Sequence, residues 1–266
     1  MAKFGFTQSD LEAWKDESFT LEGNRDVGVV MLHGWSAIPR QTRPIAERLN
    51  QKGYWVHAPR LTGHGTRPED LELATEKHWV DDTCRAVQEL KSKSQIKKVI
   101  VGGISLGGNL AMLASKRVVI DGFIFLGTPI FLKNHFAIWL GLKIISPFKK
   151  YIQKKYPRGV TRGFLTNTSY QYYPLASASE SIKVIRHSLK CLRKIKAPAL
   201  ILQTSSDYLV AKTSPWILYN SISSKNKKLQ WIKTTHGGHV LGQNDVDDLT
   251  PIMLSFIKNI EQSHNT

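Results

Sequence analysis

The chain alternates short apolar runs with segments of helical periodicity, and this alternation limits its fold more than any other feature. Six runs are rich in apolar and β-branched residues, at 27–34, 54–61, 97–105, 121–128, 198–207 and 228–235. Strands buried beneath helices have this composition. Helical patterns lie near 41–52, 78–93, 106–117, 213–222 and 245–261. We therefore expect an α/β fold with a mostly parallel central sheet flanked by helices.

The alternation is interrupted once, between the fourth and fifth apolar runs. About seventy residues lie there, whereas a strand and the next helix are usually joined by about 2 to 6 residues. We expect an inserted cap subdomain at 130–191, with the core domain formed by 1–129 and 192–266. Within the insert, residues 136–156 mix large apolar side chains with lysines. This pattern predicts two short amphipathic helices, broken at Pro147.

The positive charge of the chain is concentrated in the insert. The formal net charge is +16, from 37 Lys and Arg against 21 Asp and Glu. Residues 131–200 hold fourteen of the basic residues and only one acidic residue, Glu180. Nucleic-acid binders share such a basic balance, but they also carry aromatic or helical readout motifs, which we do not find. We therefore expect no nucleic-acid partner.

The N-terminal residues do not resemble a signal peptide, because no cationic start is followed by a sustained apolar segment. We expect a soluble cytoplasmic protein. The two cysteines, Cys84 and Cys191, are too few and too far apart to indicate a disulfide framework or a metal site. We expect them to be small buried hydrophobic residues.

A serine lies among glycines between a predicted strand and a predicted helix, in the sequence Gly103-Ile104-Ser105-Leu106-Gly107. This G-x-S-x-G pattern is weak alone, because a structural turn would also explain the glycines. Its strand-turn-helix setting strengthens it, since a nucleophile elbow requires that setting. The helix N-terminus would also present free N–H groups to a developing anion. We predict that Ser105 is a nucleophile.

A serine nucleophile needs a histidine base and a carboxylate that orients the base. In this architecture they follow in the order Ser, Asp or Glu, His. Asp207 ends an apolar run, at the expected carboxyl tip of a strand, although a simple turn aspartate is the alternative. His236 and His239 both follow the last run. We favour His239, because Gly237-Gly238 lets the loop fold over the site.

The oxyanion hole should combine the N–H of Leu106 with one N–H from the loop after an early strand. Gly34 in that loop permits close backbone approach, and Trp35 would donate the second N–H while its ring walls the acyl pocket. A buried core tryptophan is the alternative. We expect His33 and His64 to hold loops rather than react. Three further aspartates suit N-terminal capping of the last helix better than catalysis: Asp245, Asp247 and Asp248.

Five motifs together resemble the α/β-hydrolase superfamily, and in particular small bacterial carboxylesterases and monoacylglycerol lipases: HGW at 33–35, GHG at 63–65, GISLGG at 103–108, D-x-x-V at 207–210 and GGHV at 237–240. The resemblance implies a serine esterase with a small cap, without cofactor or metal. It places Ser105, Asp207 and His239 at the positions of the triad, and Trp35 and Leu106 at the oxyanion positions. The sequence departs from the family pattern in two ways. The turn that leads to Asp207 reads TSSD, where the family usually has a glycine, and the cap is unusually cationic.

The cap suggests an apolar small-molecule substrate, an ester or a lipid. Phe131, Phe136 and Trp139, together with Trp35, could line an apolar trough for an acyl chain. Lysines beside such a surface are typical of a segment resting on an anionic membrane. We therefore expect either peripheral contact with the inner membrane surface or a merely solvated cationic face.

The predicted function is hydrolysis of carboxylic esters through an acyl-enzyme. Two alternatives stay open. An acyl-CoA thioesterase would use the same triad and could bind the nucleotide phosphates with the cationic cap. A non-catalytic binding protein on the same fold is the other alternative, although it would have little reason to retain Ser, Asp and His in these places.

Overall fold

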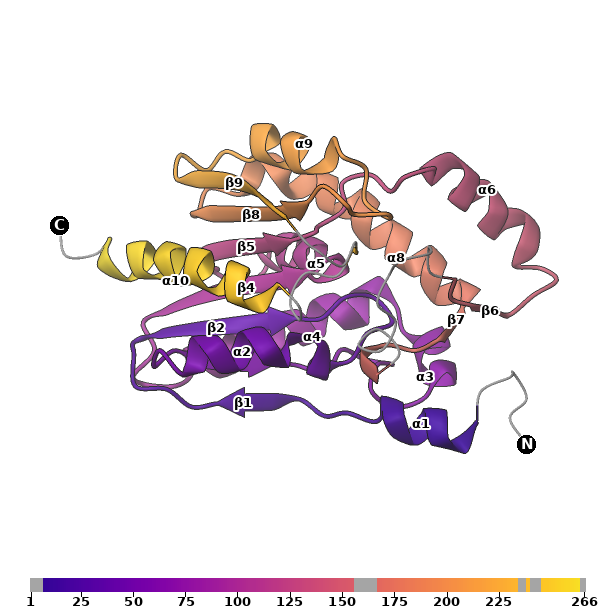
Figure 1. The fold of residues 1–266 in the computed structure, drawn as a ribbon, viewed down its shortest axis with the longest axis horizontal. Helices are drawn as coiled ribbons and strands as arrows, with labels where there is room; N and C mark the ends of the chain where they lie inside the picture. Colours follow the sequence, from indigo (N-terminus) through magenta and orange to yellow (C-terminus); the bar gives the residue numbers. More distant parts are fainter. Residues whose placement is uncertain (1–6, 156–166, 234–237, 240–244, 264–266) are drawn as a thin grey trace.

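The computed structural model describes residues 7–155, 167–233, 238–239 and 245–263. Its centre is a seven-stranded sheet in the order β1-β3-β2-β4-β5-β8-β9 (Figure 1). Neighbouring strands are parallel except for β1, which pairs antiparallel with β3. The strands are β1 (Phe19–Leu21), β2 (Val27–Leu32), β3 (Trp55–Ala58), β4 (Lys98–Ile104), β5 (Gly122–Leu126), β8 (Ala199–Thr204) and β9 (Lys227–Ile232). The predicted α/β class is confirmed.

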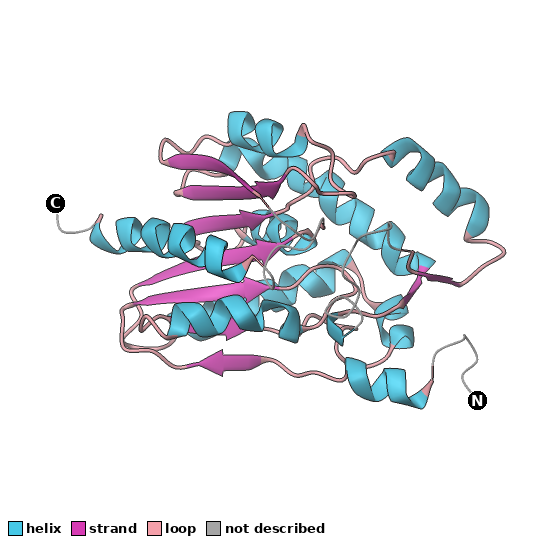
Figure 2. Cartoon of the chain, in the orientation of Figure 1, coloured by secondary structure: helices cyan, strands magenta, loops and turns pink. Residues whose placement is uncertain are grey.

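Helices cover both faces of the sheet (Figure 2). They are α1 (Gln8–Trp14), α2 (Arg43–Asn50), α3 (Pro68–Leu73), α4 (Glu76–Lys91), α5 (Leu106–Ala114), α6 (His135–Ile145), α8 (Leu175–Ser188), α9 (Ser214–Ser221) and α10 (Val246–Gln262). Helices α2 and α10 pack on one face, where Ile45, Leu49, Met253 and Ile257 are fully buried. The other face is covered by α4 and α5, with α8 packed against both of them.

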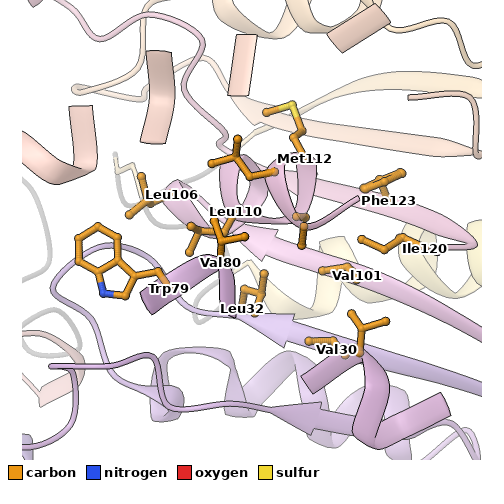
Figure 3. Close-up of a cluster of buried hydrophobic side chains, with 14 of the residues drawn as sticks. Val30, Leu32, Trp79, Val80, Val101, Leu106, Leu110, Met112, Ile120 and Phe123 are labelled. Carbon is orange, nitrogen blue, oxygen red and sulfur yellow. The ribbon is translucent and has the colours of Figure 1, made fainter. Parts of the chain in front are cut away.

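The larger core lies between the sheet and α4, α5 and α8 (Figure 3). Every residue of β2 and β4 is buried, as their continuous apolar composition predicts. Side chains from these strands meet those of α4 and α5, among them Val30, Leu32, Trp79, Val80, Val101, Leu106, Leu110 and Met112. This packing fixes the start of α5 above the carboxyl end of β4. Cys84 and Cys191 are buried and unpaired, as predicted.

The elements between β5 and β8 lie mainly on the side of the sheet toward which the parallel strands point (Figure 1). They include α6, the strand pair β6 (Tyr151–Gln153) and β7 (Tyr172–Pro174), α8 and the 3-10 helix η2 (Leu189–Lys194). Another 3-10 helix, η1 (Pro39–Thr42), precedes α2. The predicted second amphipathic helix after Pro147 is wrong for residues 147–155. Residues 151–153 form strand β6 instead, which pairs antiparallel with β7 at 172–174.

No helix of the described residues is both long enough and apolar enough to cross a bilayer. The same residues hold no group of three or more His, Cys, Asp or Glu side chains that could bind a metal ion.

Candidate active site

Ser105 occupies a strained turn between β4 and α5. Its φ of +51° and ψ of −117° lie where residues other than glycine are rarely found. The turn also requires Gly103, because a Cβ atom there would lie 2.2 Å from the carbonyl carbon of Gly107. The Ser105 N–H donates a 2.7 Å hydrogen bond to the carbonyl of Leu126. The backbone is thus bonded to the next strand, in the geometry of a nucleophile elbow.

His239 joins Ser105 to Asp207. Its Nε2 atom lies 2.7 Å from the Ser105 hydroxyl oxygen, and its Nδ1 atom lies 2.9 Å from Asp207 Oδ2. A carboxylate only accepts hydrogen bonds, so Nδ1 carries the proton and Nε2 is free to accept the serine proton. The structure therefore brings the three predicted side chains into one hydrogen-bonded chain. His236, the other candidate base, lies outside the described residues.

Asp207 is held by the turn that follows β8. Its Oδ1 atom accepts the N–H groups of Leu209 and Val210, at 2.8 and 2.9 Å, and its Oδ2 atom also accepts from Gln203 Nε2 at 2.9 Å. Burial alone would raise the pKa of Asp207. The attraction of His239, with the hydrogen bonds from His239, Val210 and Leu209, outweighs burial and holds the pKa below its usual range. The carboxylate is thus ionised at neutral pH, and four hydrogen bonds hold it in this orientation.

The rival aspartates lie elsewhere. Asp245 directly precedes α10, whereas Asp247 and Asp248 lie in its first turn. Asp247 forms an ion pair of 2.7 Å with Arg48. Their positions agree with the expected start of the last helix. The hydrogen bonds to His239 distinguish Asp207 from these three residues.

The loop after β2 passes beside Ser105. A Cβ atom on Gly34 would lie 3.6 Å from the Cβ of Ser105. As the first residue of α5, Leu106 has an N–H without an acceptor inside the helix. No hydrogen bond of the Trp35 N–H is found among the described residues. Both groups are therefore available to an oxyanion, and their role remains a prediction.

Trp35 is held as a wall of the site. Its ring meets Tyr173 edge to face, with centroids 4.8 Å apart, and its Nε1 donates to the Ser177 hydroxyl at 3.1 Å. Tyr173 and Ser177 belong to the insert, so the loop after β2 and the insert are in direct contact. A backbone hydrogen bond of 2.8 Å from Tyr170 to the carbonyl of Ser36 reinforces this contact.

Two buried histidines support the loop. The Nε2 atom of His33 accepts from the N–H of Leu61 at 3.3 Å, and its Nδ1 donates to the carbonyl of Gly34 at 2.9 Å. Burial lowers the pKa of His33 to about 4. Burial, followed by the neighbouring His33, lowers the pKa of His64 well below its usual value. Both rings are therefore neutral at pH 7, which is what loop support by acceptor nitrogens requires.

A cavity of about 200 Å³ is lined in part by Ser105 and His239. Its lining includes Gly34, Trp35, Ser105, Lys154, Lys155, Tyr173, Tyr208, Leu209 and His239. Sequence reasoning missed the two lysines and the two tyrosines. The concentration of basic residues at 131–200 was a signal for the lysines, but it does not indicate which of the fourteen basic side chains there line this cavity.

The predicted acyl-chain residues lie apart from this cavity. Phe131 and Phe136 line a second, apolar groove of about 390 Å³ between the start of the insert and α8. Its other lining residues are Ile130, Leu132, Ile182, Ile185, Arg186 and Leu189. The side chain of Trp139 is outside the described residues. Of the four predicted substrate-binding residues, the nucleophile cavity includes Trp35.

The fold and this arrangement of serine, histidine and aspartate define an α/β hydrolase. The chain belongs to the family described as serine aminopeptidase, S33, whose model matches residues 23–239. This family assignment confirms the superfamily resemblance that the five sequence motifs indicated.

Individual relatives lie within the same superfamily. The chain is similar to a carboxylesterase of Bacillus subtilis (strain 168), with 26% identity over 231 residues, 87% of this chain and 91% of the relative. It is 28% identical to a thermostable monoacylglycerol lipase of Bacillus sp. (strain H-257) over 80% of this chain and 83% of the relative. A solved structure of a metagenome-derived lipolytic enzyme superposes with a TM-score of 0.79 at 25% identity, over 91% and 97% of the two chains.

Proposed function

We propose that the protein hydrolyses carboxylic esters, with Ser105 as nucleophile, His239 as general base and acid, and Asp207 as the residue that orients the imidazole. The observation that carries the proposal is the position of His239, which hydrogen-bonds to Ser105 through Nε2 and to Asp207 through Nδ1. The similarity to a carboxylesterase and a monoacylglycerol lipase supports esters over amides.

The geometry supports a two-step acyl transfer. His239 Nε2 takes the hydroxyl proton as Ser105 Oγ bonds to the ester carbonyl carbon, and the negative charge moves to the carbonyl oxygen. The N–H groups of Leu106 and Trp35 stabilise that oxyanion. His239 then gives its proton to the departing alcohol oxygen, which leaves an acyl-serine. Water attacks the acyl-serine by the same route, releases the acid and restores Ser105.

The decisive test is Ser105→Ala, with Ser92→Ala as an exposed serine control. We expect Ser105→Ala to lower kcat for p-nitrophenyl butyrate by about 10⁶-fold, the scale seen when a triad serine is removed. A fluorophosphonate probe should label wild type and Ser92→Ala but not Ser105→Ala. Unchanged ester hydrolysis by Ser105→Ala would exclude this function. Absence of labelling in folded wild type would favour the non-catalytic binding protein.

A thioesterase remains the second candidate, because Lys154 and Lys155 face the cavity and could contact the phosphates of an acyl-CoA. Equal acyl chains carried as butyryl-CoA and as a butyrate oxygen ester separate the two candidates. A kcat/KM at least about tenfold higher for the thioester would favour the thioesterase.

We also propose that residues 130–191 act as a cap and that its outer surface contacts an anionic membrane. Large apolar side chains are exposed on and after α6, including Phe136, Ile144 and Phe148 at 65%, 57% and 89%. Exposed Lys143 and Lys149 lie beside them. Apolar side chains flanked by lysines are typical of segments that rest in a membrane interface.

Vesicle sedimentation tests this surface. Wild type should bind phosphatidylglycerol vesicles more strongly than phosphatidylcholine vesicles, and salt should weaken that binding. Phe148→Ser should reduce binding, whereas Leu73→Ser, an exposed leucine outside the insert, should not. Equal binding to both vesicle types would exclude the membrane contact.

A further inference from the structure

Lys154 lies on the wall of the cavity that contains the nucleophile. It directly follows β6, and its backbone N–H donates a 2.8 Å hydrogen bond to the carbonyl of Gln171. This bond continues the pairing of β6 with β7, so the main chain at Lys154 is held in place. The same cavity is lined by Ser105 and His239. A cationic side chain thus shares one small space with the reacting atoms.

No acidic side chain of the protein neutralises this lysine. All 21 Asp and Glu residues fall within the described ranges, and none of them forms an ion pair with Lys154 or with its neighbour Lys155. The cavity lining contains no Asp or Glu. Two other lysines of the insert do have such a partner, since Lys150 pairs with Glu72 at 2.9 Å and Lys183 pairs with Glu180.

An ammonium group in such surroundings is energetically unfavourable. Burial disfavours the charged form when no opposite charge compensates for lost hydration. Accordingly, burial lowers the pKa of Lys154 to about 7. An anion bound in the cavity would supply the missing opposite charge and keep the lysine protonated. An ionisable group with a shifted pKa that lies in a cleft is a candidate member of a functional site.

We propose that the cavity selects esters bearing a carboxylate or phosphate a few bonds from the reacting carbonyl, and that Lys154 is the residue that recognises this anion. The proposal rests on the ester hydrolysis proposed above and names its substrate class. Because the cavity has a volume of only about 200 Å³, an anion held by Lys154 must lie close to the ester. Lys155 lines the same cavity and adds to its positive potential.

The charge has a direct consequence for specificity. Lys154 is half-buried. A partly desolvated polar group that is positioned to meet a partner discriminates against an analogue that lacks the partner, since the group is then left unpaired. A neutral ester of the same length would leave Lys154 without a counter-charge. We therefore expect the protein to prefer the anionic member of a matched pair of esters.

Two matched pairs locate the anion. The acyl-side pair is p-nitrophenyl hexanoate and the p-nitrophenyl monoester of adipic acid, in which a carboxylate ends the acyl chain. The alcohol-side pair is 1-butyrylglycerol and 1-butyrylglycerol 3-phosphate. The proposal predicts that kcat/KM is at least about tenfold higher for the anionic member of one pair, the scale of a hydrogen bond to a charged group.

Variants connect this preference to Lys154. Lys154→Met should reduce the ratio of kcat/KM for the anionic and neutral members by at least about tenfold, whereas Lys154→Arg should retain most of it. Lys93→Met, which removes one exposed lysine from the core domain, should leave the ratio unchanged. Thermal melting and fluorophosphonate labelling show that each variant is folded with an accessible nucleophile. The product adipate should also bind Ser105→Ala, and Lys154→Met in that background should abolish its binding.

The outcomes separate this proposal from the proposed function. Hydrolysis of both neutral esters at rates equal to or above those of their anionic partners overturns the proposal and leaves ester hydrolysis intact. A preference for the anion that survives in Lys154→Met overturns the role of the residue. Failure to hydrolyse any ester, together with no labelling of folded protein, overturns the proposed function and this proposal with it.

Discussion

The Nε2 atom of His64 accepts a hydrogen bond of 3.0 Å from the backbone N–H of Ser36. Ser36 has a φ of +56°, which a residue other than glycine adopts only when its surroundings hold it there. It follows Trp35, whose N–H we propose as an oxyanion donor. The imidazole accepts this bond only while it is neutral. The conformation of the loop that carries Trp35 and Ser36 is therefore coupled to the protonation of a buried histidine.

Because His33 and His64 are both buried and neutral, we predict that the fold loses stability in mild acid. His33 has a pKa of about 4 in the folded state, below its ordinary value of 6.5, so the unfolded chain binds one more proton between those pH values. The free energy of unfolding should fall by about 3 kcal/mol from this residue as the pH decreases from 6.5 to 4. His64 acts in the same direction. Urea unfolding at several pH values measures the effect.

The matched variants for this prediction are His33→Gln and His78→Asn. Removing the buried imidazole at 33 should make the stability less dependent on pH between 6.5 and 4. His78 is exposed, and its replacement should leave the dependence of the unfolding free energy on pH as it is in wild type. Identical slopes in all three proteins would show that His33 does not titrate with a depressed pKa.

Asp207→Asn should lower kcat by about 10⁴-fold, as replacing the carboxylate of a serine triad does. The amide can present an N–H to His239 Nδ1, which favours the tautomer with the proton on Nε2 and removes the acceptor for Ser105. Steady-state kinetics with p-nitrophenyl butyrate measures the loss. Asp248→Asn, in the first turn of α10, is the control that should retain activity. Retention of kcat in Asp207→Asn would exclude the proposed orienting role.

Two glycine substitutions should have opposite effects on stability. Gly103→Ala should destabilise the protein by about 3 kcal/mol, because its Cβ atom would overlap backbone atoms of Gly107 and Gly108. Gly141 lies inside α6, with nothing within 4 Å of a new Cβ atom. Gly141→Ala should therefore stabilise the protein by about 0.5 to 1 kcal/mol. Urea unfolding measures both, and an unaltered stability in Gly103→Ala would contradict the close packing of the elbow.

The preference for anionic esters should decline as the pH rises through about 7. Burial places the pKa of Lys154 near that value, so the ammonium that attracts the anion is lost above it. His239 affects both members of a matched pair, and the ratio of their kcat/KM values therefore cancels its contribution. Three further titratable side chains line the same cavity as Lys154, namely Lys155, Tyr173 and Tyr208. A pH-stat assay from pH 6 to 9 measures the ratio, and a ratio that rises over this range would contradict the role of Lys154.

The core of the fold was predictable because buried strands are runs of apolar residues and buried helix faces repeat apolar residues at helical spacing, and both patterns are visible in the sequence. The six apolar runs match β2, β3, β4, β5, β8 and β9 to within a few residues at each end. The edge strand β1 was missed because it has only three residues, none of them fully buried. Helices α1, α3 and α8 were also missed. We assigned residues 175–188 to the insert and predicted no helix there, although α8 packs on α5.

The strained turn at Ser105 was predictable for a related reason. A strained turn between a strand and a helix needs glycines at fixed spacing, and the motif preserves that steric requirement in one short segment. Asp207 and His239 were candidates from their order along the chain and from their places after strands. The sequence named them as partners of Ser105, but the atoms and distances of their hydrogen bonds were not predictable, since these depend on loops whose conformations leave little pattern in the sequence.

The sequence by itself determined the fold class, the elbow and the basic charge of the insert, because each depends on composition or spacing within one segment. The tertiary structure alone decided that Lys154 and Ser105 line one cavity, that Phe131 and Phe136 line a separate groove, and which backbone groups His33 and His64 bond in and around the loop after β2. These relationships join residues from distant segments. Only the packing of the folded chain sets which distant side chains meet, so periodicity along the sequence does not encode them.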